Sequence, residues 1–188
     1  AARKTERVQA IAQDVQAKTG RIARAYTADA GDEASLRRLV ADVRAAQGDP
    51  AVLIFNAAVA QMGRPTTLPA ARVADEFRAN VLGALVLVQQ LAPAMKAAGR
   101  GTILLTGGSF AIEPSADYAS LSMSKAALRS LTHSLAQELG GAGIHVATVT
   151  VYGLVPRNTP FDPARIARSF LDLHRQPKGH FDIEAVYK

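Results

Sequence analysis

LLTGGS (residues 104–109) and YASLSMSKAAL (residues 118–128) are the two stretches that decide the fold of this 188-residue chain. The first indicates a buried strand that ends in a Gly-rich turn. The second indicates a helix of small residues that carries one lysine, Lys125. A strand, a turn and a helix in this order form the repeating unit of proteins with parallel sheets, so the segment predicts an α/β fold.

The same alternation of strands and helices extends outward in both directions. Apolar residues at helical spacing predict a helix that ends at Gly20, one between Asp32 and Gly48, and helices over 70–97, 118–139 and 163–174. Short apolar runs between turn residues predict strands over 21–28, 51–55, 102–106 and 144–151. We expect the run 51–55 to be covered on both faces, as parallel strands usually are.

The longest predicted helix, residues 70–97, has a recurring apolar side that we expect to be buried. This side consists of Val73, Phe77, Val81, Leu85, Val88 and Met95. Pro93 has no backbone N–H and is expected to kink the last turns. Asn80 falls between Phe77 and Val81. A buried amide without partners costs about 1–3 kcal/mol, so this residue either has a purpose or faces solvent.

Parallel neighbouring strands need crossover helices, so the alternation predicts an open, doubly wound parallel sheet in three α/β/α layers. We expect one domain over residues 1–188. In such sheets ligands bind at the carboxyl ends of the strands. Asn56, Gly107, Gly108 and Gly153 fall at these ends.

The net charge of +6 and the pI of about 10.0 raise the question of a polyanionic partner. The basic residues are scattered, however, and the pair Arg37-Arg38 lies on the polar side of a predicted helix beside acidic residues. Only 5% of the residues are aromatic, which leaves no platform for stacking bases. We therefore expect no nucleic-acid partner.

The sequence also disfavours a metal-binding protein, a membrane protein and an exported protein. The chain has no cysteine, and its four histidines show no metal-ligand spacing, so we expect no metal site. No apolar run reaches the ~20 residues of a membrane span, and the first residues contain no signal-peptide core. We expect a cytoplasmic protein without a membrane partner.

The order and spacing of these elements resemble the short-chain dehydrogenase/reductase family over residues 3–186. The resemblance implies a Rossmann-like fold that moves hydride between a nicotinamide dinucleotide and the carbonyl or alcohol of a small-molecule substrate. The family's sheet opens with a strand, a Gly-rich phosphate turn and a helix, and this sequence contains no such opening. We expect it to lack the first two strands, roughly one βαβ unit of ~30 residues or more; the alternative is a minimal protein.

The family's catalytic residues are only partly present. The resemblance assigns Lys125 to the nicotinamide ribose and to lowering the pKa of a nearby tyrosine, whereas the alternative is a surface lysine. Leu121 occupies the position of that tyrosine, four residues before the lysine, and Gly108 occupies that of the family's serine. Tyr118 and Ser109 lie close by in sequence and are the candidate proton donors, although Tyr118 is one helical turn further from Lys125.

Further site residues follow from the resemblance. Asn80 is similar to the family's buried helical Asn, which kinks its helix and holds a relay water. Asp29 is similar to an acidic residue that contacts adenine, with plain helix capping as an equally good alternative. The turn after residue 55 and the turn after residue 151 are similar to those that line the cofactor cleft. Their candidate cofactor-binding residues are Asn56, Ala57, Ala58, Tyr152 and Gly153.

Arg3 and Lys4 stand where the family recognises the adenosine ribose. A basic residue there pairs with a 2′-phosphate, so we expect NADP(H), with NAD(H) as the alternative. Residues 155–180 correspond to the family's substrate-covering loop and helix. The family's usual assemblies imply a homodimer or a homotetramer.

Two interpretations remain on the sequence alone. In the first, the protein is an active NADP-dependent oxidoreductase whose proton donor has moved. In the second, it binds the nucleotide but is catalytically impaired, and acts as a sensor or scaffold. Leu121 and Gly108 favour the second, and the retained Lys125 and Asn80 favour the first.

Overall fold

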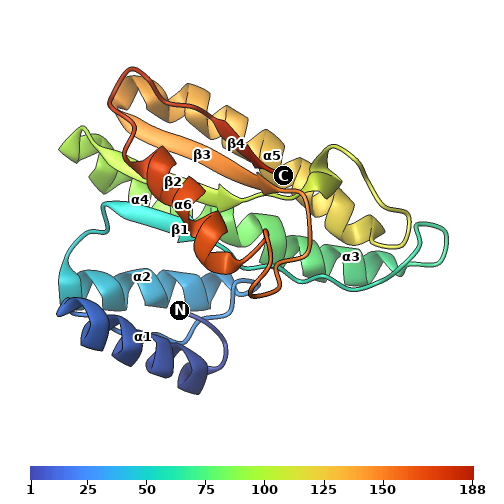
Figure 1. Cartoon of the computed structure of the whole chain (residues 1–188), viewed down its shortest axis with the longest axis horizontal. Coiled ribbons are helices and arrows are strands. Elements are labelled where there is room, and N and C mark those ends of the chain that lie inside the picture. The colour runs from blue at the N-terminus through green and yellow to red at the C-terminus, as the bar shows by residue number, and fades with distance from the viewer.

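Four parallel strands in the order β1-β2-β3-β4 form the centre of the computed structural model, which describes residues 1–188 (Figure 1). The strands are β1 (Val52–Phe55), β2 (Gly101–Thr106), β3 (Ile144–Val151) and β4 (Glu184–Tyr187). Their registers place Phe55 beside Leu105, Leu105 beside Thr148, and Thr148 beside Glu184. The carboxyl ends of all four strands therefore meet at one edge.

Helices cover both faces of this sheet and confirm the predicted doubly wound architecture. They are α1 (Thr5–Thr19), α2 (Glu33–Gln47), α3 (Ala70–Phe77), α4 (Gly83–Ala98), α5 (Ala119–Leu139) and α6 (Pro163–His174). One core joins α2, α4 and α5 to Ile103 and Leu105 of β2. Leu104 points the other way, into a second core that contains Ile166 and Leu173 of α6. This alternation along β2 is the period of two that a strand imposes.

The predicted helix ends agree closely with the structure. The carboxylate of Asp32 accepts a hydrogen bond from the Ala34 N–H at 2.9 Å and begins α2. Gly20 adopts a left-handed conformation with φ of 67° and ends α1. Asp162 caps α6 in the same way, by accepting from the Ala164 N–H at 2.8 Å.

The predicted helix over 70–97 contains a π turn, Arg78–Leu82, between α3 and α4. A π turn adds one residue to the helix, so the buried side shifts by one position after it. Val81, Val88 and Met95 are buried, as expected, and Leu85, which follows the π turn, is only partly buried. Val73 and Phe77, which precede the π turn, are also only partly buried, contrary to the prediction. Glu76 is buried instead, which the apolar pattern did not predict.

Residues 70–98 form one helical stretch, long and apolar enough to suit a membrane span. In this protein the stretch is a core helix, because α4 packs on α2 and β2, and the π turn packs on α5. It continues through Pro93 to Ala98.

The strand predicted over 21–28 is wrong. This segment forms a single parallel bridge, between Thr27 and Ala2, and otherwise has no strand beside it with which to exchange ladder hydrogen bonds. The burial expected for residues 51–55 is also wrong on one side. Val52 and Ile54, which share one face of β1, are 38% and 55% exposed, so that face is not covered. β1 is also the edge strand of the sheet, because only β2 pairs with it.

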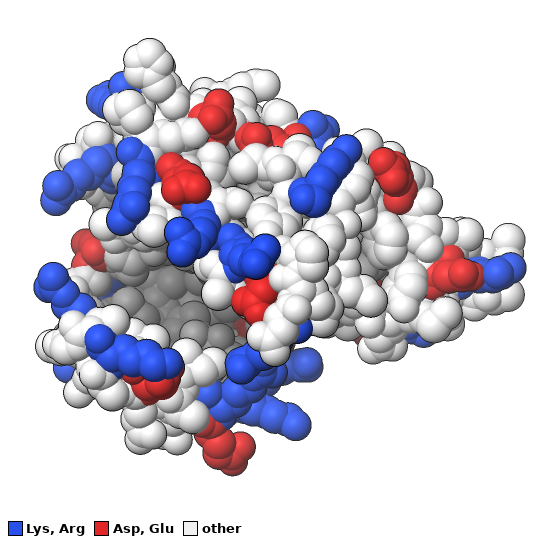
Figure 2. Space-filling view, in the orientation of Figure 1, with Lys and Arg blue, Asp and Glu red and all other residues white.

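A hollow lies between the helix α1, the segment that follows it and the helix α2. A cavity of about 1010 Å³ is lined by α1, by residues 20–26 and by Ala46 of α2. Figure 2 shows the hollow with Lys and Arg side chains around its rim.

Strand β4 was not predicted from the sequence. It is four residues long, and Glu184 lies in it, a residue type that strands disfavour. Its position depends on tertiary contacts: the Arg129 guanidinium of α5 donates to both Glu184 carboxylate oxygens, and the Thr150 hydroxyl donates to one of them at 2.5 Å.

Candidate functional site

The carboxyl edge of the sheet brings together the turns that follow β1, β2 and β3. Asn56 follows β1, Gly107 follows β2, and Tyr152 follows β3. The Gly107 N–H donates to the Val149 carbonyl at 2.9 Å. A Cβ at Gly107 would lie 2.6 Å from the Thr148 hydroxyl, so only glycine fits this close approach between β2 and β3.

Lys125 reaches this edge from α5. Its Nζ donates a hydrogen bond of 2.6 Å to the Thr106 carbonyl at the end of β2. The side chain passes Gly108, where a Cβ would lie 3.6 Å from the lysine Cε. Burial lowers the pKa of Lys125 from 10.5 to about 8, because the ammonium is partly withdrawn from water. These contacts exclude the alternative of a surface lysine.

The two candidate donors make other contacts. Tyr118 is the residue before α5, and its ring stacks on Phe110 with centroids 5.7 Å apart. Ser109 begins the 3-10 turn Ser109–Ala111, and its carbonyl accepts from two following N–H groups. The Lys125 ammonium donates to the Thr106 carbonyl and forms no hydrogen bond with Tyr118 or Ser109. Their catalytic roles stay predictions.

Asn80 is buried in the π turn, which excludes a solvent-facing position. Its Oδ1 accepts from the Val59 N–H at 2.6 Å, and its Nδ2 donates to the Val59 carbonyl at 2.9 Å. Asn80 thus fixes the loop that follows Asn56, Ala57 and Ala58. The helix irregularity expected at Asn80 is present, whereas the relay water stays a prediction.

A second cavity, of about 650 Å³, joins Arg3 and Asp29 to Val59 and the start of the π turn. Asp29 Oδ1 accepts from the Gly31 N–H at 2.8 Å, and the Asp29 N–H donates to the Ser35 hydroxyl at 3.1 Å. Asp29 therefore stabilises the turn before α2 and also lines the cavity. Arg3 and Asp29, the two residues predicted to contact the adenosine, are far apart in the sequence but line the same cavity.

Residues 1–160 match the model of a protein family that is described as "short chain dehydrogenase". This chain belongs to the short-chain dehydrogenase family. A short-chain dehydrogenase/reductase from Hericium erinaceus is 32% identical over 167 residues, which are 86% of this chain and 63% of that protein. An uncharacterised NAD-dependent oxidoreductase from Mycobacterium tuberculosis is 32% identical over 179 residues, or 89% of this chain and 64% of that protein. The chain thus spans less than two thirds of these relatives.

Solved structures of the family have the same fold. A metagenomic short-chain oxidoreductase in complex with NADP superposes with a TM-score of 0.87 and 30% identity, covering 98% of this chain and 81% of that one. An alcohol dehydrogenase from the archaeon Thermococcus sibiricus has a TM-score of 0.89 at 19% identity, covering 98% and 82%, and shows the likeness of fold alone.

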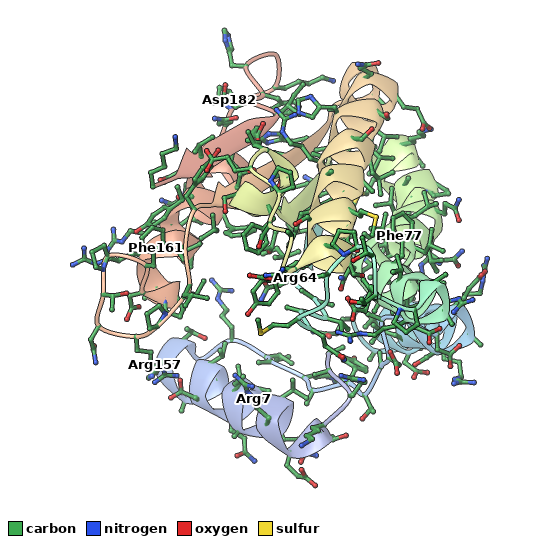
Figure 3. All side chains as sticks on the ribbon, turned by 90° about the vertical axis from the view of Figure 1, so that its right-hand side faces the viewer. Arg7, Arg64, Phe77, Arg157, Phe161 and Asp182 are labelled. Atoms are coloured by element: carbon green, nitrogen blue, oxygen red, sulfur yellow. The ribbon has the colours of Figure 1, made fainter.

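The segment 155–180 of this family member is tied to the sheet by aromatic residues. A Cβ at Gly153 would lie 3.0 Å from the Phe161 ring, which itself meets the Tyr187 ring edge-on at 5.7 Å. The Tyr187 hydroxyl donates to the Pro160 carbonyl at 2.6 Å. Figure 3 shows Phe161 on this segment, on the opposite side of the molecule from Phe77.

Sequence reasoning missed Glu76, which lines the second cavity. Its Oε1 accepts from the Arg72 Nε at 3.1 Å, and its buried Oε2 has no hydrogen-bond partner. The available signal was its spacing: Glu76 is one helical turn before Asn80, so a buried Asn80 could have suggested a buried Glu76.

Proposed function

We propose that the protein is an NADP-dependent oxidoreductase that moves hydride between nicotinamide and a carbonyl or alcohol substrate. The observation that carries this proposal is Lys125, whose ammonium is held against the Thr106 carbonyl at the carboxyl end of β2. Residues at this edge are the ones that meet the ligand in doubly wound sheets. Membership of the family supports the reaction class.

The residues at the site fit a nicotinamide dinucleotide at both of its ends. Lys125 Nζ uses one donor on Thr106, so it has others to offer to the hydroxyls of the nicotinamide ribose. Gly108 leaves space beside the Lys125 methylenes, where a Cβ would lie no closer than 3.6 Å to any atom. At the other end, Arg3 and Asp29 would hold the adenosine. When bound, the reduced nicotinamide supplies the hydride.

The preference for NADP(H) rests on Arg3, which lines the same cavity as Asp29. A guanidinium pairs well with a 2′-phosphate, whereas an NAD-specific site needs an acceptor for the free ribose hydroxyls. One solved relative contains NADP, and one curated relative is named NAD-dependent, so the family offers both choices.

The first prediction concerns Arg3→Ala. We expect this variant to bind NADPH about tenfold more weakly while its affinity for NADH is unchanged, because only NADPH has the 2′-phosphate. Fluorescence titration of both nucleotides measures the change. Arg38→Ala, on the exposed face of α2, is the matched control. Equal losses of affinity for NADPH and NADH would contradict the proposed preference for NADP(H).

The second interpretation, a nucleotide-binding family member with impaired catalysis, is favoured by Leu121 and Gly108. A screen of carbonyl substrates with NADPH and NADH separates the two. Turnover supports the enzyme, and binding without turnover on any carbonyl supports a sensor or scaffold. If neither nucleotide binds, both interpretations fail.

We also propose a cytoplasmic homodimer or homotetramer that acts on a small molecule, without nucleic-acid or membrane partners. Leu82 of the π turn and Met123 of α5 are 42% and 48% exposed, and these two elements pack side by side. Apolar side chains on neighbouring helices suit an interface between copies. Light scattering on the purified protein tests the assembly state.

A further inference from the structure

We propose that Lys125 itself donates the proton to the substrate oxygen during carbonyl reduction. This proposal rests on the proposed oxidoreductase function and names the proton donor of the same site. It starts from the position one helical turn before Lys125, where the side chain is that of Leu121 and has no proton to give.

The surroundings of Lys125 support a direct role. Its ammonium is held at the edge of the sheet by one hydrogen bond, to the Thr106 carbonyl, and no carboxylate forms an ion pair with it. Gly108 has no side chain to cover the lysine methylenes. Tyr118, the nearest phenol along the helix, is stacked on Phe110. Lys125 is therefore the ammonium that a substrate oxygen at this edge would meet.

The charged groups on α5 and on the elements packed against it contact groups other than Lys125. Arg129, one turn after Lys125, is paired with Glu184. On α3, Glu76 is paired with Arg72, and on the π turn Arg78 is exposed. His145 of β3 lies at the amino end of the sheet. Tyr152 follows the carboxyl end of β3, and its ring contacts the Lys188 ammonium, 4.4 Å from the ring centroid. The 3-10 turn Ser109–Ala111 contributes no charge.

Hydride transfer to the carbonyl carbon and proton transfer to its oxygen together convert the carbonyl into an alcohol. The carbonyl carbon accepts a hydride from the reduced nicotinamide dinucleotide, and a C–H bond forms. The electron pair of the C=O π bond moves to oxygen, which takes a proton from the Lys125 Nζ and becomes a hydroxyl. The N–H bond breaks and leaves a neutral amine, which regains a proton from water.

The acidity of Lys125 suits this step. Burial lowers its pKa to about 8, so both the ammonium and the amine are populated near neutral pH. A general acid works best when its pKa lies near the working pH. Since the donor must be protonated, the rate of carbonyl reduction should fall as the pH rises through about 8.

Two variants separate proton donation from cofactor binding. Lys125→Arg keeps a cation with hydrogen-bond donors, but a guanidinium does not release a proton in this pH range. We expect it to retain NADPH binding and to lose turnover by about 10²–10⁴-fold. Lys125→Met should lose turnover and also bind NADPH more weakly. Thermal unfolding checks that both variants fold.

A second readout does not depend on activity. The rate at which acetic anhydride acylates each lysine, followed by mass spectrometry over a pH series, reports the pKa of its amine. Lys125 should show a midpoint of about 8. A midpoint for Lys125 at the ordinary lysine value of 10.5 would overturn the proposal.

The outcomes distinguish this proposal from the function on which it rests. If Lys125→Arg turns over like the wild type, or if Tyr118→Phe abolishes turnover, another group donates the proton and the oxidoreductase function stands. If the wild type reduces no carbonyl although Lys125 titrates at about 8, the proposed function fails and this proposal fails with it.

Discussion

Gly107 and Gly108 are neighbours at the end of β2, yet the structure constrains them differently. A Cβ at Gly107 would lie 2.6 Å from the Thr148 hydroxyl and 3.2 Å from the Thr150 Cα, whereas at Gly108 the nearest atom would be 3.6 Å away. Gly107 thus holds β2 close to β3, and Gly108 provides space beside Lys125. One residue serves the fold and the other serves the site.

We therefore expect Gly107→Ala to lower the free energy of unfolding by about 1–3 kcal/mol, because the methyl group forces the two strands apart. Gly108→Ala is the matched control and should unfold like the wild type. Urea denaturation of the two variants measures the difference. Equal stabilities would show that the close approach at Gly107 is relaxed in solution.

The positions of candidate site residues could be predicted from the sequence where a strand end or a helix face fixes them. Lys125, Asn56 and Gly153 lie at the carboxyl edge of the sheet, as predicted, and their roles stay predictions. What Asn80 binds could not be predicted, because its partner, Val59, lies in an irregular loop 21 residues away. Glu76 was not predicted because burial was assigned from apolar residues alone, although its spacing of four residues from Asn80 indicated the same side of the helix.

At the scale of elements, local signals specified helices better than strands. Asp32, Gly20 and Asp162 are caps that act within a few residues, and each predicted helix end agreed with the structure. A strand needs a partner, and sequence does not show whether one is present. Residues 21–28 have a strand-like pattern without a ladder, whereas β4 has a weak pattern but pairs with β3.

The anchoring of β4 by Glu184 leads to a prediction about pH. The Arg129 hydrogen bonds hold the pKa of Glu184 below its ordinary value, so the folded state favours the carboxylate. Its contribution to stability is then present above the unfolded pKa of about 4.3 and is lost as the pH falls through the lower folded pKa. At pH 7, Glu184→Gln should unfold at a lower urea concentration than the wild type. This difference in urea concentration should become smaller as the pH falls.

Urea denaturation at a series of pH values tests this coupling. Glu138→Gln, whose carboxylate pairs with Lys96 on the exposed side of α5, is the matched control and should show a much smaller gap at pH 7. A gap for Glu184→Gln that does not change between neutral and acidic pH would contradict the coupling.

At the scale of the whole molecule, the open edge of β1 is the main exposed feature of the fold. Ile54 is 55% exposed beside backbone groups that no strand pairs. Exposed apolar edge strands pair with other chains. We expect this edge to promote association beyond the proposed dimer or tetramer and Ile54→Lys to suppress that association, because a charge on the edge opposes such pairing.

Light scattering over a concentration series measures this association. Leu154→Lys changes an 87% exposed residue in the loop after β3 in the same chemical way and should have little effect. If the two substitutions reduce association equally, general surface hydrophobicity is responsible and not the β1 edge.

The central claim is that this site transfers hydride from a nicotinamide to a carbonyl. Its most direct test is to supply NADPH carrying deuterium at the transferable position, with a panel of ketones and aldehydes, and to analyse the alcohols by mass spectrometry. The account predicts one deuterium on the former carbonyl carbon with the wild type, and almost none with Lys125→Met. Unlabelled products, or no product from any carbonyl under conditions where NADPH binds, would contradict it.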